Sequence, residues 1–112
     1  MKRYCMIYEV KKEHVNDYID IHKNCWPEQL KALRDAGAKN LQIFMYNNYS
    51  IILYECEDFD EWLEKLAKTD ENKKWQEILN PWFMDTPVLE GQGKIKTLEK
   101  IFDLEQQLGD IV

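Results

Sequence analysis

The hydrophobic positions change their spacing several times along the chain, and each change marks an expected element. Residues 3–10 alternate in a way that predicts a strand largely buried on one face, with Tyr4, Met6, Tyr8 and Val10 sharing a face. From residue 11 to residue 36 the apolar positions recur at threes and fours, so we expect one long helix. Gly37 follows, where a left-handed cap is expected.

Two extended runs and two further helices follow. Residues 39–57 form two strand-like runs around Asn47 and Asn48, and asparagine tolerates the positive φ of a tight turn, so we expect a β-hairpin. Asp58 or Asp60 then opens a helix. Thr69 and Asp70 interrupt it and cap a second helix, which ends before Pro81. Residues 85–94 read as a loop.

The remaining segment, residues 94–108, has hydrophobic spacing that suits a helix better than a strand. If it is a strand, the element order becomes β-α-β-β-α-β, the ferredoxin-like α+β arrangement. Helices on one face of such a sheet leave the other face uncovered. The strands are apolar on both faces, so a second copy of the chain is the economical cover.

Size and charge narrow the class of protein. The 112 residues are enough for one domain with its own core, spanning residues 1–112. The net charge of −6 argues against partners such as nucleic acid or an anionic membrane surface. No apolar run is long enough to span a bilayer, and the N-terminus is too short and too polar for a signal peptide, so we expect a cytoplasmic protein.

The cysteines do not point to a metal or a disulfide. Cys5, Cys25 and Cys56 are odd in number and far apart, and no histidine lies at zinc-ligand spacing from them. We interpret them as small buried hydrophobes in a reducing compartment.

Tyr18, His22 and Trp26 recur at intervals of four and therefore share one helical stripe. One interpretation is a helix histidine satisfied by its neighbours, with no chemical role. The other is a mixed polar and aromatic surface, which a plain core would not favour. Pro27 either begins a helix in its first turn or bends one and widens a cleft beside His22.

Trp75 and Gln76 are candidates for contact with a ligand. Tryptophan faces stack on the C–H faces of sugars, although a helical tryptophan is more often core. The amide of Gln76 could bind hydroxyls or face water. The acidic residues of the later helices look like solvated surface, and there is no glycine-rich phosphate loop.

Several motifs together resemble the L-rhamnose mutarotase family and related sugar 1-epimerases. The most specific is YxxxHxxxWPE, from Tyr18 to Glu28. A GAxN stretch begins at Gly37, and a TD pair at Thr69 is followed by Trp75. The closing TLEKIFDL, residues 97–104, looks like the family's last strand, and on that resemblance we expect a strand there despite its helical spacing.

The resemblance implies a homodimer with sheets packed across it, and cofactor-free interconversion of the α and β anomers of a 6-deoxy sugar. It implies that His22 is the proton donor and that Tyr18 contacts the sugar. A histidine suits this reaction because its ordinary pKa lies near neutral pH. The family's substrate-contacting tyrosine is replaced by Leu41, and the second of its paired tryptophans by Gln76. L-Rhamnose and a related sugar such as L-fucose therefore fit equally well.

Two other functions stay open on the sequence. One is a non-catalytic sugar- or metabolite-binding module on the same fold, because folds do not fix functions. The other is a different reaction of this fold, such as that of a small oxygenase, for which no residue here selects.

Overall fold

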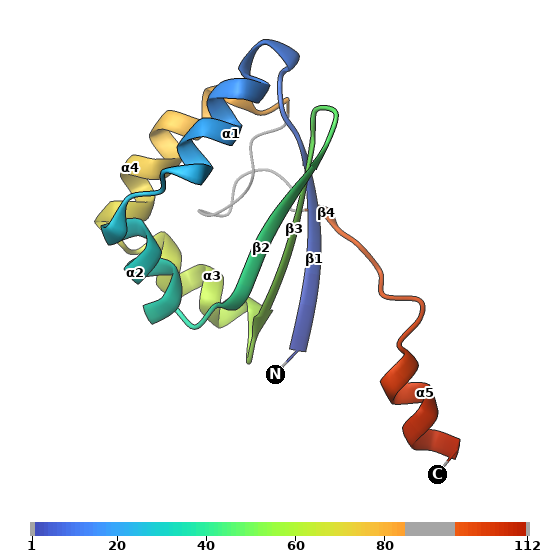
Figure 1. The fold of residues 1–112 in the computed structure, drawn as a ribbon. Coiled ribbons are helices and arrows are strands. Elements are labelled where there is room, and N and C mark those ends of the chain that lie inside the picture. Colours follow the sequence, from blue (N-terminus) through green and yellow to red (C-terminus); the bar gives the residue numbers. More distant parts are fainter. Residues whose placement is uncertain (1, 85–95, 112) are drawn as a thin grey trace.

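An antiparallel sheet of four strands organises the molecule, in the order β2-β3-β1-β4. The computed structural model describes residues 2–84 and 96–111 (Figure 1). Strands β1 (Lys2–Glu9) and β3 (Tyr49–Cys56) pair along their whole length at the centre of the sheet, and β2 (Lys39–Tyr46) lies on one edge. The short β4 (Lys96–Thr97) lies against β1 on the other edge.

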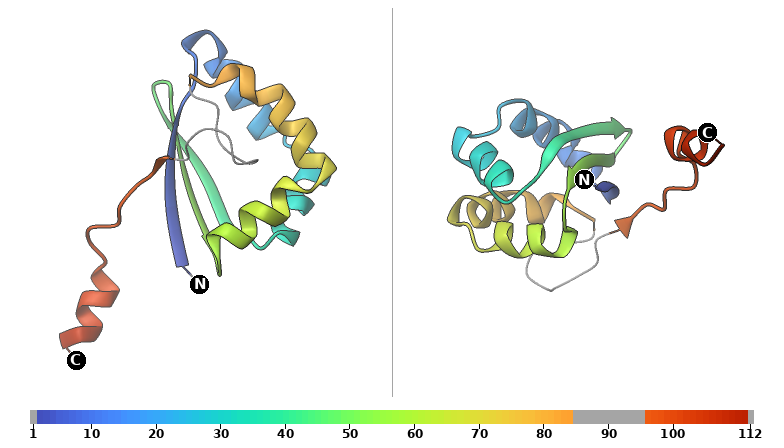
Figure 2. Two further views of the ribbon diagram at one scale, coloured as in Figure 1. Left: turned by 180° about the vertical axis from the view of Figure 1, so that it is seen from behind. Right: turned by 90° about the horizontal axis from the view of Figure 1, so that it is seen from below.

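Four helices cover one face of this sheet (Figure 2). They are α1 (Val15–Lys23), α2 (Pro27–Asp35), α3 (Phe59–Ala67) and α4 (Asp70–Leu79). Short 3₁₀ turns precede α1 at Lys12–His14 and follow α4 at Asn80–Trp82. With each helical pair counted as one connection, the order is β-α-β-β-α-β, which confirms the predicted ferredoxin-like α+β fold.

The single long helix expected over residues 11–36 is wrong, because the chain breaks between α1 and α2. The side chain of Asn24 donates a hydrogen bond to the carbonyl of Asp20 (3.0 Å) and ends α1. Trp26 is extended, as favoured before a proline, and Pro27 is the first residue of α2, where its missing N–H costs nothing. The helix-start interpretation of Pro27 is therefore right.

Turns form where the sequence places residues that tolerate positive φ. Gly37, just past α2, has φ of 115°, and Asn47 has φ of 54° in the tight hairpin that joins β2 to β3. The side chains of Asp58 and Thr69 accept backbone hydrogen bonds at the starts of α3 and α4. These expectations are confirmed, whereas the loop expected over residues 85–94 lies outside the described residues.

The C-terminal strand is much shorter than expected. Within the described residues it pairs with β1 at Lys96 and Thr97, and the N–H of Leu98 adds one bond to the carbonyl of Cys5 (2.7 Å). The chain then leaves the sheet and ends in α5 (Leu104–Ile111), away from the main body (Figure 1). The expected strand over residues 97–104 is thus wrong beyond Thr97, and the helical spacing describes the end of the chain better.

The two faces of the sheet differ in what covers them. On the helix side Ser50, Ile52 and Tyr54 are buried. On the outer face Phe44 and Tyr46 stay 53% and 67% exposed, and in the described chain all the helices over the sheet lie on the other side (Figure 2). The arm after β4 also carries exposed hydrophobic side chains, namely Leu98, Ile101, Phe102, Leu104 and Leu108.

Candidate functional site

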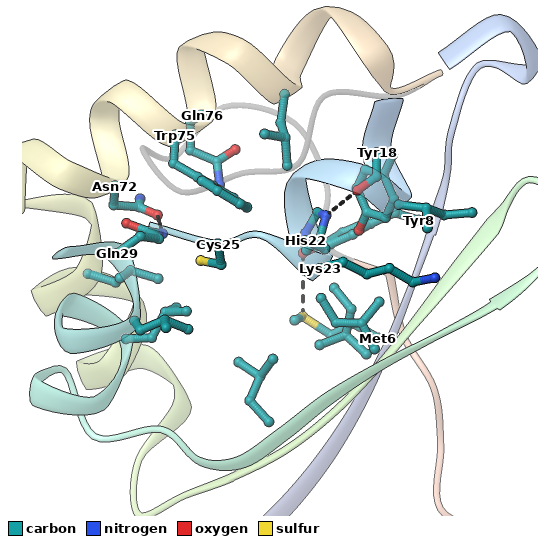
Figure 3. Close-up of a pocket in the computed structure, with 18 of the residues that line it drawn as sticks. Met6, Tyr8, Tyr18, His22, Lys23, Cys25, Gln29, Asn72, Trp75 and Gln76 are labelled. Atoms are coloured by element: carbon teal, nitrogen blue, oxygen red, sulfur yellow. Dashed lines mark hydrogen bonds between the residues drawn. The ribbon is translucent and has the colours of Figure 1, made fainter. Parts of the chain in front are cut away.

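A cavity of about 580 Å³ lies between the helices and the inner face of the sheet. Figure 3 shows side chains from both layers turned towards it. Its lining is mainly hydrophobic, with a few polar groups, which is the usual composition of a small-molecule site. Most of these polar groups come from helices, namely those of Tyr18, His22, Lys23, Gln29, Asn72 and Gln76, and the hydroxyl of Tyr8 comes from β1.

His22 lies in the last turn of α1 and lines this cavity. Its Nδ1 lies 2.7 Å from the main-chain carbonyl oxygen of Tyr18. A carbonyl oxygen can only accept, so Nδ1 carries the hydrogen and donates it, and the neutral ring keeps its lone pair on Nε2. Burial lowers the pKa of His22 below its ordinary value, partly offset by this hydrogen bond. At neutral pH the ring is therefore an uncharged base at Nε2.

Tyr18 supports His22 from the same helix. The centroids of their rings lie 4.1 Å apart, and Tyr18 is only 2% exposed. Its hydroxyl lies 2.6 Å from Oγ of Ser50, on β3. Burial raises the pKa of Tyr18 to about 12, against a lowering by the Ser50 hydrogen bond, so the phenol keeps its proton at neutral pH. It can donate or accept hydrogen bonds, but it is no base.

Trp75, from α4, forms an aromatic wall beside the histidine. Its ring meets His22 edge to face, with centroids 5.2 Å apart. Trp26 meets Trp75 in the same way at 5.3 Å and supports it from behind, since Trp26 is not among the cavity's lining residues. Of the predicted stripe, Tyr18 and His22 therefore line the cavity, whereas Trp26 packs against Trp75.

Gln76 and Leu41 are the two positions at which the sequence departs from the pattern of the family that it resembles. Both residues line the cavity. Oε1 of Gln76 is buried and has no hydrogen-bond partner. Leu41, on β2, offers only an apolar surface. All four predicted site residues, Tyr18, His22, Trp75 and Gln76, therefore come together around one cavity.

The sequence interpretation missed Gln29 and Asn72, which also line the cavity. Nε2 of Gln29 donates to Oδ1 of Asn72 (3.1 Å) and joins α2 to α4. A signal was present, because Asn72 lies three residues before Trp75 on α4 and therefore shares its inner stripe. Gln29 likewise lies three residues after Trp26.

Two further properties concern only the part of the chain that the structure describes. Within it, no three His, Cys, Asp or Glu side chains gather as a metal site requires. No helix in residues 2–84 and 96–111 is long and apolar enough to cross a membrane.

The fold and the site together define a ferredoxin-like protein with one neutral imidazole lining an apolar cavity. The sequence profile of the L-rhamnose mutarotase family matches residues 3–104. The chain therefore belongs to the L-rhamnose mutarotase family.

Individual relatives agree with this assignment. The chain is 34% identical to the L-rhamnose mutarotase of Oceanobacillus iheyensis, over 72% of this chain and 79% of that protein. It is 31% identical to the L-rhamnose mutarotase of Lactiplantibacillus plantarum, over 94% of this chain and all of that one. The crystal structure of an L-rhamnose mutarotase from Formosa agariphila superposes with a TM-score of 0.73 at 21% identity, covering 93% of this chain and 99% of that one, which supports the fold.

Proposed function

We propose that this protein is a mutarotase that interconverts the α and β anomers of L-rhamnose or of a related 6-deoxy sugar such as L-fucose. Family membership supports the reaction. The observation that carries the proposal is His22, whose Nδ1–H is engaged by a main-chain carbonyl while the ring lines a cavity with an aromatic wall. The ligand is a small sugar, and no cofactor is needed for this chemistry.

The reaction is a double proton transfer around ring opening. The anomeric hydroxyl loses its proton, the bond between C1 and the ring oxygen breaks, and the ring oxygen gains a proton. The open aldehyde turns about its C1–C2 bond and closes with the opposite configuration. Nε2 of neutral His22 takes the proton from the anomeric hydroxyl, and the imidazolium that forms donates it to the ring oxygen. His22 is thus the donor to the ring oxygen, after first acting as a base.

The other predicted site residues bind and orient the sugar in this proposal. The Tyr18 hydroxyl, held by Ser50, positions a hydroxyl of the substrate next to the imidazole. The face of Trp75 packs on the C–H face of the ring. Gln76 binds a hydroxyl through the oxygen that has no protein partner, after its buried amide turns towards the cavity. Leu41 provides no polar group that would favour L-rhamnose over L-fucose, so the experiment below compares the two sugars.

We also propose that the single domain works as a homodimer in the cytoplasm. Support for the dimer comes from the exposed apolar outer face, where Phe44, Ile51 and Ile7 align across three strands, and from the hydrophobic arm after β4. Support for a reducing compartment comes from three cysteines without a disulfide. Light scattering after gel filtration should give twice the chain mass for the wild type and the chain mass for Phe44→Lys.

Saturation-transfer NMR on L-rhamnose and L-fucose tests the activity. We expect the wild type to accelerate exchange between the anomeric signals of at least one of these sugars, and His22→Ala to abolish the acceleration. Binding of sugar without accelerated exchange would instead identify a non-catalytic binding module. Unchanged exchange in a folded His22→Ala variant would overturn the role of His22.

A further inference from the structure

Three polar side chains are almost fully buried in the described chain: Gln29, Ser50 and Asn72, with exposed fractions of 1%, 0% and 2%. Ser50 has an evident purpose, because it bonds the hydroxyl of Tyr18. Among the described residues, the side chains of Gln29 and Asn72 hydrogen-bond only to each other, across the contact between α2 and α4 (3.1 Å). The mechanism described above does not use this amide pair.

Packing alone does not explain the pair. Gln29 Oε1 is buried with no partner, and an unsatisfied acceptor of this kind costs about 1–3 kcal/mol. Two apolar side chains of similar shape would avoid that cost, since replacing both partners of a buried hydrogen bond is often neutral or stabilising. Because the Gln29–Asn72 pair costs folding free energy, we look for a role other than packing.

Its position supplies that role. Gln29 and Asn72 line the same cavity as His22, and Figure 3 shows the pair and the histidine on opposite sides of Cys25. Four buried side-chain polar atoms in the described chain have no partner, and three of them belong to residues that line this cavity: Gln29, Trp62 and Gln76. Unused hydrogen-bonding capacity is therefore concentrated around one cavity.

We propose that the Gln29–Asn72 amide pair is a specificity site that binds a ring hydroxyl of the sugar whose anomeric carbon lies at His22. This inference rests on the proposed function. Oε1 of Gln29 is sealed in the structure, so contact requires a rotamer change that brings the free amide atom of Gln29 to the cavity. In the present arrangement that free atom is Oε1, which accepts a hydrogen bond from a sugar hydroxyl. If both amides also flip by 180°, Asn72 donates to Gln29, and Nε2 of Gln29 is the free atom and donates to the hydroxyl.

The test uses Gln29→Met, which keeps the length of the side chain and removes both polar atoms. We expect the KM for the sugar to rise about tenfold, the typical value of one lost hydrogen bond, with kcat within about twofold of wild type. The double variant Gln29→Met/Asn72→Leu leaves neither partner unpaired and carries the same expectation if the single variant folds poorly. Lys31→Met is the matched control, because it adds methionine to the exposed side of α2, outside the cavity.

Deoxy analogues of the sugar, each lacking one ring hydroxyl, distinguish a role of Gln29 in sugar binding from a role in stabilising the fold. The wild type should bind one analogue about tenfold more weakly than the parent sugar, and Gln29→Met should bind that analogue and the parent equally. A merely structural role would instead lower the melting temperature and leave this ratio unchanged.

The outcomes distinguish the two proposals. Unchanged KM and unchanged analogue ratios in a folded variant, with exchange still catalysed, would overturn this inference alone. Sugar binding that depends on Gln29, without accelerated exchange, would overturn only the mutarotase function. A wild type that binds none of these sugars would overturn both.

Discussion

Two tyrosines buried between the helices and the sheet, Tyr18 from α1 and Tyr54 from β3, illustrate how a site differs from a core. Tyr54 and Tyr18 are each 2% exposed, and burial raises the pKa of both. Among the described residues, the Tyr54 hydroxyl donates only to the sulfur of Met6 at 3.7 Å, and its ring packs on Trp62. The Tyr18 hydroxyl has a serine at 2.6 Å, and its ring packs on a histidine.

The two clusters around these tyrosines have similar hydrophobic content. The first holds Tyr54 and Trp62, and the second holds Tyr18, Trp75 and Phe83. What distinguishes the second is the presence of polar atoms with fixed partners beside the cavity. Burial and aromatic content alone therefore do not identify a site; hydrogen-bonded polar groups among them do.

The largest effect should come from His22→Gln, which keeps a polar side chain but removes the titrating group. We expect the catalysed exchange rate to fall roughly 100- to 10,000-fold, the usual contribution of general acid–base catalysis. Anomer exchange measured by NMR, with the uncatalysed rate subtracted, checks this. The control is His14→Gln, because His14 lies outside the cavity and pairs with Asp17, so its exchange rate should stay within about twofold.

Tyr18→Phe should have the next largest effect. It removes the hydroxyl that positions the substrate and leaves Ser50 buried without its partner. We expect kcat/KM to fall about tenfold and the free energy of unfolding to fall by about 1–3 kcal/mol. Exchange kinetics and urea unfolding measure the two losses, and a variant with wild-type kinetics would remove Tyr18 from the site.

The pH dependence should report the environment of His22. Its pKa is lowered from the ordinary 6.5, so the unfolded chain takes up this proton first as the pH falls. The stability that this group contributes is therefore fully present above about pH 6.5 and is lost as the pH falls from there towards the folded pKa. Catalysed exchange should stay level above pH 6.5 and decline on the acid side, with a midpoint below 6.5.

Exchange rates and melting temperatures between pH 5 and pH 8 check both statements. The comparison between wild type and His22→Gln isolates the histidine, because the variant should lose its share of the pH dependence of stability. A midpoint for catalysis above 6.5 would contradict the assignment.

Tyr54→Phe should have the smallest effect, because the hydroxyl it removes has only a weak sulfur acceptor. We expect exchange within about twofold of wild type and a change in unfolding free energy below about 1 kcal/mol. The same kinetic and urea measurements apply. A loss of activity as large as that of Tyr18→Phe would break the contrast between the two clusters.

Much of this arrangement could be predicted from the sequence, because local signals determine it. Spacing placed Tyr18 and His22 on one stripe, and Asp58 and Thr69 marked the starts of two helices. The break before Pro27 was ambiguous, since the apolar spacing continues through it with little change of phase. Proline also fits either a kink or a helix start.

The rest depends on contacts between distant parts of the chain. The point after Thr97 where the chain stops pairing with β1 depends on contact between distant segments, which no local pattern encodes. Gln29 and Asn72 are 43 positions apart, and each alone looks like an ordinary polar residue of a helix surface. Only the packing of α2 against α4 shows that their amides meet inside the protein.

The bond between His22 and the main-chain carbonyl of Tyr18 has a consequence for how this pocket can diversify. No side-chain replacement at position 18 deletes that acceptor, so the tautomer of the imidazole is insulated from changes elsewhere in the pocket. The rest of the cavity lining comes from other parts of the fold, among them β2, α2 and α4. Under the proposed function, new carbohydrate preferences can therefore evolve on those elements while the imidazole and its tautomer are inherited intact.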